Sequence, residues 1–249
     1  MGNNYFRFKK FMVYQDKCSM KVCTDACIFG AWLTQKSITG KWDIAHCLDI
    51  GTGTGLLSLM YAQKNLKAII DAVEIEENAG IQAKENFLSS AWSNRLKIHH
   101  TDIKKFVSDK KYELIISNPP FYENELSTNE KNKNIAKHDA GLRLENLMGV
   151  IKKHLAPAGR FAILLPLHRI EYFEDLAAEN NFFPQEKLLV RQTPKHNFFR
   201  CGMIFSQNKT ELKPAELIIK NNNDYTNELI ELMKDYYLDN AFASIASVK

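Results

Sequence analysis

The sequence has no run of about 18 consecutive apolar residues, which is the length that a membrane-spanning helix needs. Its first residues, MGNNYFRFKK, lack the apolar segment of a secretory signal peptide. Internal repeats and low-complexity segments are also missing, and the composition excludes fibrous and intrinsically disordered proteins. We therefore expect a cytoplasmic protein that does not enter a membrane.

Cysteine is scarce as well, and its five residues are an odd number. In a chain without an export signal, such cysteines are expected to be reduced thiols rather than a disulfide framework. Cys18, Cys23 and Cys27 lie close together, but their C-x4-C-x3-C spacing differs from the paired CxxC motifs of zinc sites. No spaced histidine completes a ligand set, so we expect no bound metal.

The 249 residues, of which 45% are hydrophobic and 25% charged, are enough for one globular domain with a sizeable core. The excess of basic over acidic residues lies outside the middle of the chain. Residues 1–25 contain five basic and two acidic side chains, and residues 182–214 contain six and two. Residues 26–181 contain nineteen of each, and residues 215–249 contain three and six. A neutral middle with basic flanks favours a polyanionic partner such as a nucleic acid.

Apolar, β-branched segments alternate with segments of helical period through the middle of the chain. The predicted strands are His46–Ile50, Ile69–Ile75, Leu96–Thr101, Leu114–Ser117 and Phe161–Leu165, and the predicted helices are Leu56–Gln63, Asn78–Ser89 and Leu144–Leu155. This alternation predicts an α/β fold with a doubly wound, mostly parallel sheet. Glu186–Gln192 and Met203–Ser206 are two strands without a helix between them, which predicts an antiparallel hairpin at the C-terminal edge of the sheet.

The first candidate site is the glycine-rich segment Leu48-Asp49-Ile50-Gly51-Thr52-Gly53-Thr54-Gly55, between a predicted strand and a predicted helix. Glycines there permit a tight turn and let the backbone approach a ligand over the helix N-terminus. The GxGxG spacing is one residue shorter than the GxGxxG motif of dinucleotide-binding proteins. It favours a nucleoside over a pyrophosphate, although a simple glycine-rich turn would have the same pattern.

Acidic residues end the next two strands. Glu74 follows the glycine-rich segment by about 20 residues, where a carboxylate can accept hydrogen bonds from both hydroxyls of a ribose. Asp102 closes the following strand, and from that edge it could bind an adenine amino group. The alternative is that Asp102 only caps a helix.

The most specific motif is Asn118-Pro119-Pro120-Phe121, directly after the predicted strand that ends at Ser117. The two prolines remove backbone donors and stiffen the turn, so that carbonyl groups and the Asn118 amide can point at one spot. Converging acceptors suit an exocyclic NH2 group, and Phe121 offers a face on which a planar ring can stack. Holding the amine by its hydrogens turns its lone pair toward an electrophile.

These motifs resemble those of class I S-adenosylmethionine-dependent methyltransferases of the N6-adenine type. The chain is most similar to the bacterial tRNA1(Val) (adenine-N6)-methyltransferase family, which modifies the adenine 3′ of the anticodon in a valine tRNA. The similarity extends from about residue 6 to about residue 207. It includes Phe6–Phe11, Gln15–Val22, Thr24-Asp25, Gly30-Ala31-Trp32, LDIGTGTG, VEIEE, Lys97–Asp102, Ser117–Phe121 and Ala136–Asp139. Since other amine and amide methyltransferases share NPPF, the family assignment depends on the N-terminal segments.

The resemblance implies a Rossmann-like, seven-stranded fold and S-adenosyl-L-methionine as the cofactor. It implies that Gly51, Gly53 and Gly55 wrap the methionine part of the cofactor. Glu74 would bind the cofactor ribose, and Asp102 would bind the cofactor adenine. Three more residues complete the implied cofactor site: Lys21, Thr24 and Asp49.

The resemblance also implies that Asn118 and Pro119 accept hydrogen bonds from the target amine, in a turn stiffened by Pro120, while Phe121 stacks on the flipped base. Because the sulfonium already activates the methyl group, the protein mainly supplies alignment. A base in an RNA loop costs less to unstack than one in a duplex, which favours an anticodon loop as the substrate.

Basic side chains with aromatic residues between them are typical of surfaces that contact phosphates and stack on bases. The candidate RNA-binding residues are Arg7, Lys9, Lys10, Arg191, Lys195, His196 and Arg200, with Phe198 and Phe199 among them. The alternative is that the phenylalanines belong to the core and the charges form a solvated face.

We expect a monomer with a single domain in three parts. Residues 1–35 form an N-terminal extension on the cofactor site, residues 36–207 form the core, and residues 208–249 form a tail with a surface helix at Glu228–Tyr237. The polar segment Tyr122–Asp139 is a candidate long loop.

Three other functions remain open from the sequence. A protein glutamine methyltransferase would use NPPF in a similar way but would not need the basic hairpin. A nicotinamide oxidoreductase would need the longer glycine motif. A non-catalytic RNA-binding protein would not need Glu74 together with an intact NPPF motif.

Overall fold

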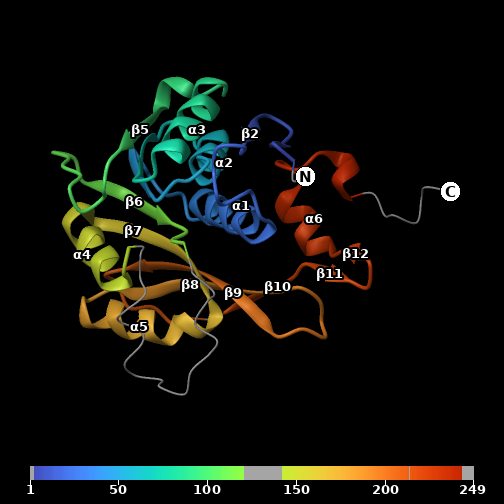
Figure 1. The fold of residues 1–249 in the computed structure, drawn as a ribbon. Helices are drawn as coiled ribbons and strands as arrows, with labels where there is room; N and C mark the ends of the chain where they lie inside the picture. Colours follow the sequence, from blue (N-terminus) through green and yellow to red (C-terminus); the bar gives the residue numbers. More distant parts are fainter. Residues whose placement is uncertain (1–2, 121–141, 213, 243–249) are drawn as a thin grey trace, which may run out of the picture.

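The computed structural model describes residues 3–120, 142–212 and 214–242 (Figure 1). The strands are β1 (Tyr5–Arg7), β2 (Met12–Tyr14), β3 (His46–Ile50), β4 (Ile69–Glu74), β5 (Leu96–His100), β6 (Tyr112–Ser117), β7 (Leu155–Pro166), β8 (Phe183–Arg191), β9 (Phe198–Ser206), β10 (Ala215–Ile218), β11 (Lys220–Asn221) and β12 (Asp224–Tyr225). The α-helices are α1 (Thr24–Thr39), α2 (Leu56–Lys64), α3 (Glu77–Leu88), α4 (Leu144–His154), α5 (Ile170–Glu179) and α6 (Asn227–Met233).

In the described part of the chain, the central sheet has eight strands in the order β10-β8-β9-β7-β6-β3-β4-β5. Strands β3 to β7 run parallel to one another, and β9 is antiparallel to both β7 and β8. Strand β8 therefore runs in the same direction as β7, and β10 is parallel to β8. The carboxyl ends of every strand except β9 meet at one edge of the sheet, which we call the carboxyl edge. The strand order reverses between β3 and β6, where ligands of such sheets bind.

The predicted doubly wound, mostly parallel sheet is confirmed. The count differs by one strand, since the sheet has eight strands rather than seven. The additional strand, β10, pairs with β8 over Ala215–Ile218, so the predicted β8–β9 hairpin lies one strand in from the edge.

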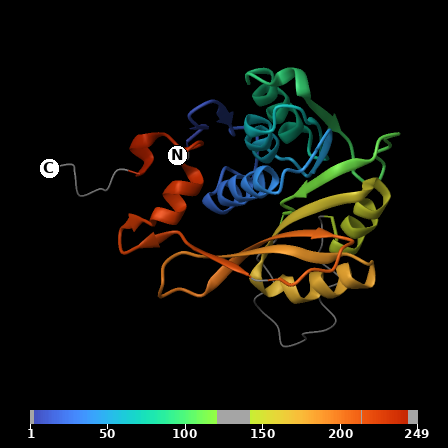
Figure 2. The same cartoon turned by 180° about the vertical axis from the view of Figure 1, so that it is seen from behind.

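Helices cover both faces of the sheet (Figures 1 and 2). An apolar core lies between each face and its helices. Cys47 and Ile70 point to the core under α1, α2 and α3, whereas Leu48 and Val73 point to the core under α4 and α5. This alternation follows from the two-residue period of a strand. Because both faces are covered, the strands consist of nearly continuous apolar residues.

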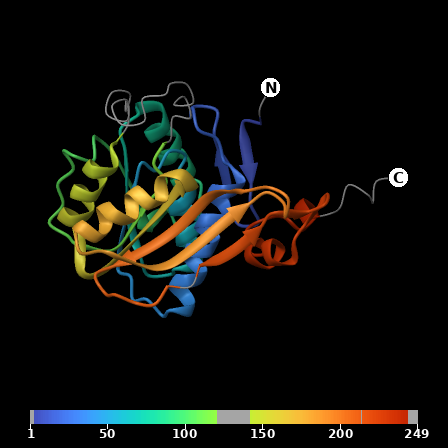
Figure 3. The same cartoon turned by 90° about the horizontal axis from the view of Figure 1, so that it is seen from below.

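The two ends of the described chain lie side by side (Figures 2 and 3). The Lys9 N–H donates to the Tyr236 carbonyl over 2.8 Å, and the Tyr236 hydroxyl donates to the Met60 carbonyl. Leu229 and Tyr237 are buried in the same core as the N-terminal strands. The segment that we expected to form a surface helix therefore has a buried face, and its helix α6 ends at Met233.

The Leu229→Ala variant tests whether α6 belongs to the cooperative unit. Leu229 has no exposed surface, so truncating it should lower the free energy of unfolding by about 2–5 kcal/mol. Urea unfolding followed by circular dichroism measures this loss. The neighbouring Glu228→Ala variant changes an exposed side chain and should stay within about 0.5 kcal/mol of the parent. An equally small effect of Leu229→Ala would show that α6 unfolds independently.

Candidate active site

Three predicted motifs meet at the carboxyl edge, at the point where the strand order reverses. Ile50, the last residue of β3, lies opposite Val73 of β4 on one side and Ser117 of β6 on the other. The Ser117 hydroxyl also donates to the Ile50 carbonyl over 3.0 Å. The glycine-rich loop after β3 is therefore flanked by Glu74 at the end of β4 and by Asn118 after β6.

The conformation of the glycine-rich loop requires its glycines. Gly51, Gly53 and Gly55 have φ angles of 69°, 55° and 83°, a region that side-chain-bearing residues avoid. A Cβ on Gly55 would lie 2.4 Å from the Phe87 ring, whereas a Cβ on Gly51 or Gly53 would meet nothing within 4 Å. The first two glycines thus leave open space over the loop, and the third packs it against α3.

Asp49 is completely buried under this loop. Its Oδ2 accepts hydrogen bonds from the Thr52 and Ser58 hydroxyls, each over 2.7 Å. Its Oδ1 has no hydrogen-bond partner among the described residues. Burial raises the pKa of Asp49 to about 6, against the lowering effect of the Ser58 and Thr52 hydroxyls. A buried carboxylate with one unpaired oxygen is suited to a cationic group of a ligand.

Glu74 is almost fully buried, and its carboxylate is held by backbone groups. The Gly53 N–H donates to Oε2, and the N–H groups of Ile75 and Glu76 donate to Oε1, all over 2.9 Å. A carboxylate can accept about four hydrogen bonds. One acceptor position therefore remains at an edge where a ribose hydroxyl would lie.

Asp102 follows β5 and forms a local turn. Its Oδ1 accepts a hydrogen bond from the Lys104 N–H over 2.9 Å, and its Oδ2 lies 3.4 Å from the Lys104 ammonium. No helix begins between Asp102 and β6, a stretch that the structure describes in full, so the alternative that Asp102 caps a helix is wrong. Its predicted contact with the cofactor adenine stays a prediction.

Asn118 is half-buried after β6, Pro119 is buried and Pro120 is exposed. No contact within the described ranges uses the Asn118 side-chain amide, so both its oxygen and its NH2 group are available to a ligand. Phe121 and the predicted loop Tyr122–Asp139 lie outside the described residues.

The segment between β2 and α1 passes beside the cofactor side of this edge. Cys18 is buried there, and its pKa is raised to about 11 by burial and by the nearby Glu74 and Glu76 carboxylates. Lys21 is exposed three residues before Thr24, the first residue of α1. The structure thus brings the N-terminal segment to the same edge as Glu74.

Asp25 fixes the start of α1 to the sheet. Its Oδ2 accepts a hydrogen bond from Arg200 Nε over 2.8 Å, and both side chains are largely buried. Arg200 lies opposite Pro166, the last residue of β7, so this ion pair is also at the carboxyl edge. Arg200 thus has a structural partner, in addition to its predicted contact with RNA.

The remaining candidate RNA-binding residues form two groups. Arg191, Lys195 and His196 belong to β8 and the following turn, which is at the carboxyl edge. Arg191 pairs with Glu216 over 3.4 Å, whereas Lys195 and His196 are exposed.

The other group belongs to the N-terminal strands, where Arg7 is exposed. The Lys9 ammonium binds Asp239 over 2.6 Å, and Lys10 lies near Asp235, which pairs with Lys64 at the last residue of α2. Since α2 begins at the glycine-rich loop, Lys9 and Lys10 lie toward the end of α2 that is far from the site.

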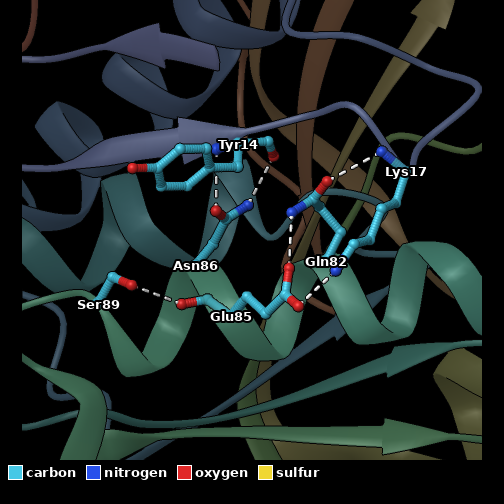
Figure 4. A network of polar contacts seen from close by, with 6 residues as sticks. All are labelled: Tyr14, Lys17, Gln82, Glu85, Asn86 and Ser89. Atoms are coloured by element: carbon cyan, nitrogen blue, oxygen red, sulfur yellow. Dashed lines mark hydrogen bonds and ion pairs between the residues drawn. The ribbon is translucent and has the colours of Figure 1, made fainter. Parts of the chain in front are cut away.

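The sequence reasoning missed the polar residues that support the site. Thr52 and Ser58 hold Asp49, and Gln82 and Asn86 of α3 bind the backbone of the N-terminal segment (Figure 4). A signal for the second pair existed. The two amides are spaced i, i+4 on a helix face that is otherwise apolar.

The part of the chain that the structure describes has no helix that is both long and apolar enough to cross a membrane. Among the same residues, no group of three or more His, Cys, Asp or Glu side chains could hold a metal ion.

Comparisons with known proteins agree on one family. A model of the methyltransferase small domain family matches residues 32–166. The tRNA1(Val) (adenine(37)-N6)-methyltransferase of Trichodesmium erythraeum is 42% identical over 243 residues, which are 96% of this chain and 99% of that protein. The protein of the same name from Dyadobacter fermentans is 40% identical over 95% of this chain and 98% of its own length.

The chain belongs to the tRNA1(Val) (adenine(37)-N6)-methyltransferase family. Among solved structures, a protein from Agrobacterium tumefaciens described as a predicted O-methyltransferase has a TM-score of 0.65 at 14% identity, and the match covers 85% of this chain and 96% of that chain. A ribosomal protein L11 methylase from Lactobacillus delbrueckii has a TM-score of 0.52 at 18% identity, over 73% and 77% of the two chains. At such identities these structures support the methyltransferase fold alone.

Members of this methyltransferase family use S-adenosyl-L-methionine, and the residues present fit that cofactor. The unpaired Asp49 Oδ1 suits the cationic methionine end, and the open space over Gly51 and Gly53 lets a ligand approach the backbone. Glu74 offers a carboxylate for the ribose. The individual contacts of these residues with the cofactor remain predictions.

The pH dependence of cofactor binding tests the role of Asp49. Protonation below about pH 6 removes the charge that attracts the cationic methionine end. Isothermal calorimetry should therefore give a dissociation constant for S-adenosylhomocysteine that rises about tenfold between pH 7.5 and pH 5.

The Asp49→Asn variant should bind S-adenosylhomocysteine more weakly than the parent protein, and its dissociation constant should lack this pH dependence.

The same substitution should make the protein more stable, so the free energy of unfolding should increase. Because the folded-state pKa of Asp49 is raised, its charge destabilises the protein above about pH 6, and removing it should add up to about 3 kcal/mol at pH 7.5. A variant that keeps the parent's pH-dependent binding would contradict the assignment.

Proposed function

We propose that this protein transfers the methyl group of S-adenosyl-L-methionine to the exocyclic N6 amine of adenine 37 in tRNA1(Val), as a cytoplasmic monomer. The substrate is that of the relatives with nearly full-length similarity. The observation that carries the chemistry is the available Asn118 amide, next to the glycine-rich loop at the reversal of the strand order. An amine held there would lie beside the methionine end of the cofactor site.

The bound cofactor supplies an electrophilic methyl group on its sulfonium. The Asn118 side-chain oxygen and the Pro119 carbonyl accept hydrogen bonds from the two N–H groups of the target amine, which orients its lone pair, and one of these two protons is lost to solvent during or after the transfer. Pro120 restricts the turn that presents both acceptors. Since an aromatic amine is a poor nucleophile, alignment rather than a strong base lowers the barrier. Phe121 follows directly and is proposed to stack on the base.

The substrate is tested with nucleoside mass spectrometry of tRNA1(Val) transcripts incubated with the purified protein and cofactor. We expect N6-methyladenosine in the anticodon-loop fragment and none in a transcript with guanine at position 37. A release factor with a glutamine-containing loop serves as the second substrate. Methylation of that protein without methylation of tRNA would establish the glutamine methyltransferase alternative.

The Asn118→Ala variant tests the catalytic assignment. Losing an acceptor for the amine should lower kcat by about 100-fold or more, by the usual scale for misaligned reactants. Binding of S-adenosylhomocysteine should be unchanged, because Asn118 is separated from the Glu74 side of the site by β3. Single-turnover kinetics and calorimetry measure the two quantities. Parent-like turnover would exclude the proposed role.

Phosphate contacts are proposed at the β8–β9 turn, which lies at the same edge as the target site. Lys195 and His196 are exposed there, and Arg191 stacks over the Phe198 ring at 4.8 Å. Positive charge next to an aromatic ring suits an RNA loop with unstacked bases. Arg7, Lys9 and Lys10 would contribute only if the tRNA extends to the N-terminal strands.

Replacing Lys195 with Ala tests this surface. Loss of one phosphate contact should weaken tRNA binding and reduce the slope of log K against log[salt] by about 1. Filter binding at several salt concentrations measures both. Lys67→Ala removes the same charge from the loop before β4, at the opposite edge of the sheet, and serves as the control. Equal effects of the two substitutions would mean that the β8–β9 turn does not contact tRNA specifically.

A further inference from the structure

Asn86 connects two segments that are far apart in the sequence. It lies in α3 with 1% of its surface exposed. Its Oδ1 accepts a hydrogen bond from the Tyr14 N–H over 2.9 Å (Figure 4). Its Nδ2 donates to the Tyr14 carbonyl over 2.9 Å and to the Thr54 carbonyl over 2.8 Å. One buried amide therefore joins the N-terminal segment to the glycine-rich loop.

The Thr54 carbonyl belongs to the peptide that leads into Gly55, so its direction determines the shape of the loop. Gly55 has a φ of 83° and packs against the Phe87 ring, the neighbour of Asn86. Helix α3 thus contacts the loop through a hydrogen bond and through an aromatic side chain. The hydrogen bond from Asn86 holds the carbonyl side of the 54–55 peptide, while its N–H side, the Gly55 N–H, donates to the Thr52 carbonyl within the loop over 2.9 Å.

The Tyr14 backbone is the start of the segment that passes the cofactor side of the site. Three residues later, the Lys17 N–H donates to Gln82 Oε1 over 3.0 Å, one turn closer to the start of α3. Gln15 Oε1 accepts a hydrogen bond from the Val22 N–H over 2.8 Å, which ties the two ends of the segment together. These hydrogen bonds continue the anchoring of the segment from Tyr14 toward Lys21.

Apolar contacts alone would hold the N-terminal segment on the protein but would not fix this backbone. Phe8, Phe11 and Val13 are buried in the core under α1, α2 and α3, and Phe11 contacts the Trp92 ring. Removing the Asn86 amide would leave these anchors in place. Tyr14 and Thr54 could then move independently, which would change the position of the glycine-rich loop relative to Lys21.

We propose that Asn86 is a positioning residue for the methyl transfer: it makes the glycine-rich loop and the N-terminal segment one rigid wall of the cofactor site. This role rests on the proposed function only in that the site holds S-adenosyl-L-methionine. Asn86 touches neither substrate nor reacting atoms, and it acts through the Thr54 carbonyl and the Tyr14 backbone.

The test compares Asn86→Ala with two control variants, one at Gln82 in α3 and one at Ser89, which caps the C-terminal end of α3. Hydrogen–deuterium exchange of the free protein reports the mobility of residues 12–17 and 51–55, and calorimetry reports the affinity for S-adenosylhomocysteine. For Asn86→Ala we expect faster exchange in both segments and an increase of the dissociation constant by about 10- to 100-fold. Gln82→Ala should accelerate exchange near Lys17 while residues 51–55 stay protected. Ser89→Ala, which removes an exposed hydroxyl bonded to the Glu85 carbonyl, should change neither.

A folded Asn86→Ala variant with parent-like exchange at residues 51–55 and parent-like affinity would overturn the proposal. Equal acceleration of those residues in Gln82→Ala would overturn it as well, because the coupling would then not pass through Asn86. If Asn86→Ala does not fold, Asn86→Asp gives the same comparison. It keeps the size and the acceptor for the Tyr14 N–H but loses both donors. Neither measurement uses tRNA, so a failure to methylate tRNA would affect only the proposed function.

Discussion

The register of β3 against its two neighbours is the constraint on which the site depends. Ile50 lies opposite Val73 and Ser117, so the three chain segments that leave these strands begin at the same height. The strand order reverses at this point, so the next helices leave on opposite faces of the sheet and a space opens between the loops. The glycine-rich loop, Glu74 and Asn118 are brought together by this register, although they are up to 67 residues apart in the sequence.

Local patterns were sufficient to predict the central strands and the helices that follow them, because short apolar, β-branched segments alternate with segments of helical period. Local patterns did not predict the parts of the fold that depend on contacts between distant chain segments. Residues 156–159, which follow the predicted helix Leu144–Leu155 and precede the predicted strand Phe161–Leu165, lie inside β7, where the pairing with β6 shifts register and so accommodates Pro157. Strand β10 has four residues, which are too few to form a clear sequence pattern, and its pairing with β8 defines it as a strand.

The same distinction between local sequence patterns and tertiary contacts applies to the residues of the candidate site. Residues in motifs, such as Glu74 and Asn118, could be placed from their position after a strand. The residues that support them could not, because Ser58 and Asn86 act through contacts with chain segments 9 to 72 residues away. The charge pattern was also insufficient. Lys9 and Arg200 are basic residues that pair with acidic residues of the same chain, which composition does not reveal.

Buried polar groups are costly unless they are paired, and here they are concentrated around the proposed cofactor site. Asn86 uses its oxygen and both of its N–H donors, while Asp49 leaves one oxygen without a partner in the described structure. The fully paired Asn86 amide makes the wall of the site rigid, and the unpaired oxygen of Asp49 leaves a negative charge that a ligand can pair with. Their proximity suits a site that must align two reactants rather than supply a strong base.

The account is tested most directly by a crystal structure of the protein with S-adenosylhomocysteine and an adenosine-containing anticodon-loop oligonucleotide. It predicts the cofactor ribose on Glu74, the methionine ammonium near Asp49 and the target N6 amine within hydrogen-bond distance of the Asn118 side chain and the Pro119 carbonyl. A cofactor bound away from the glycine-rich loop, or a target base outside the space between Asn118 and that loop, would contradict it.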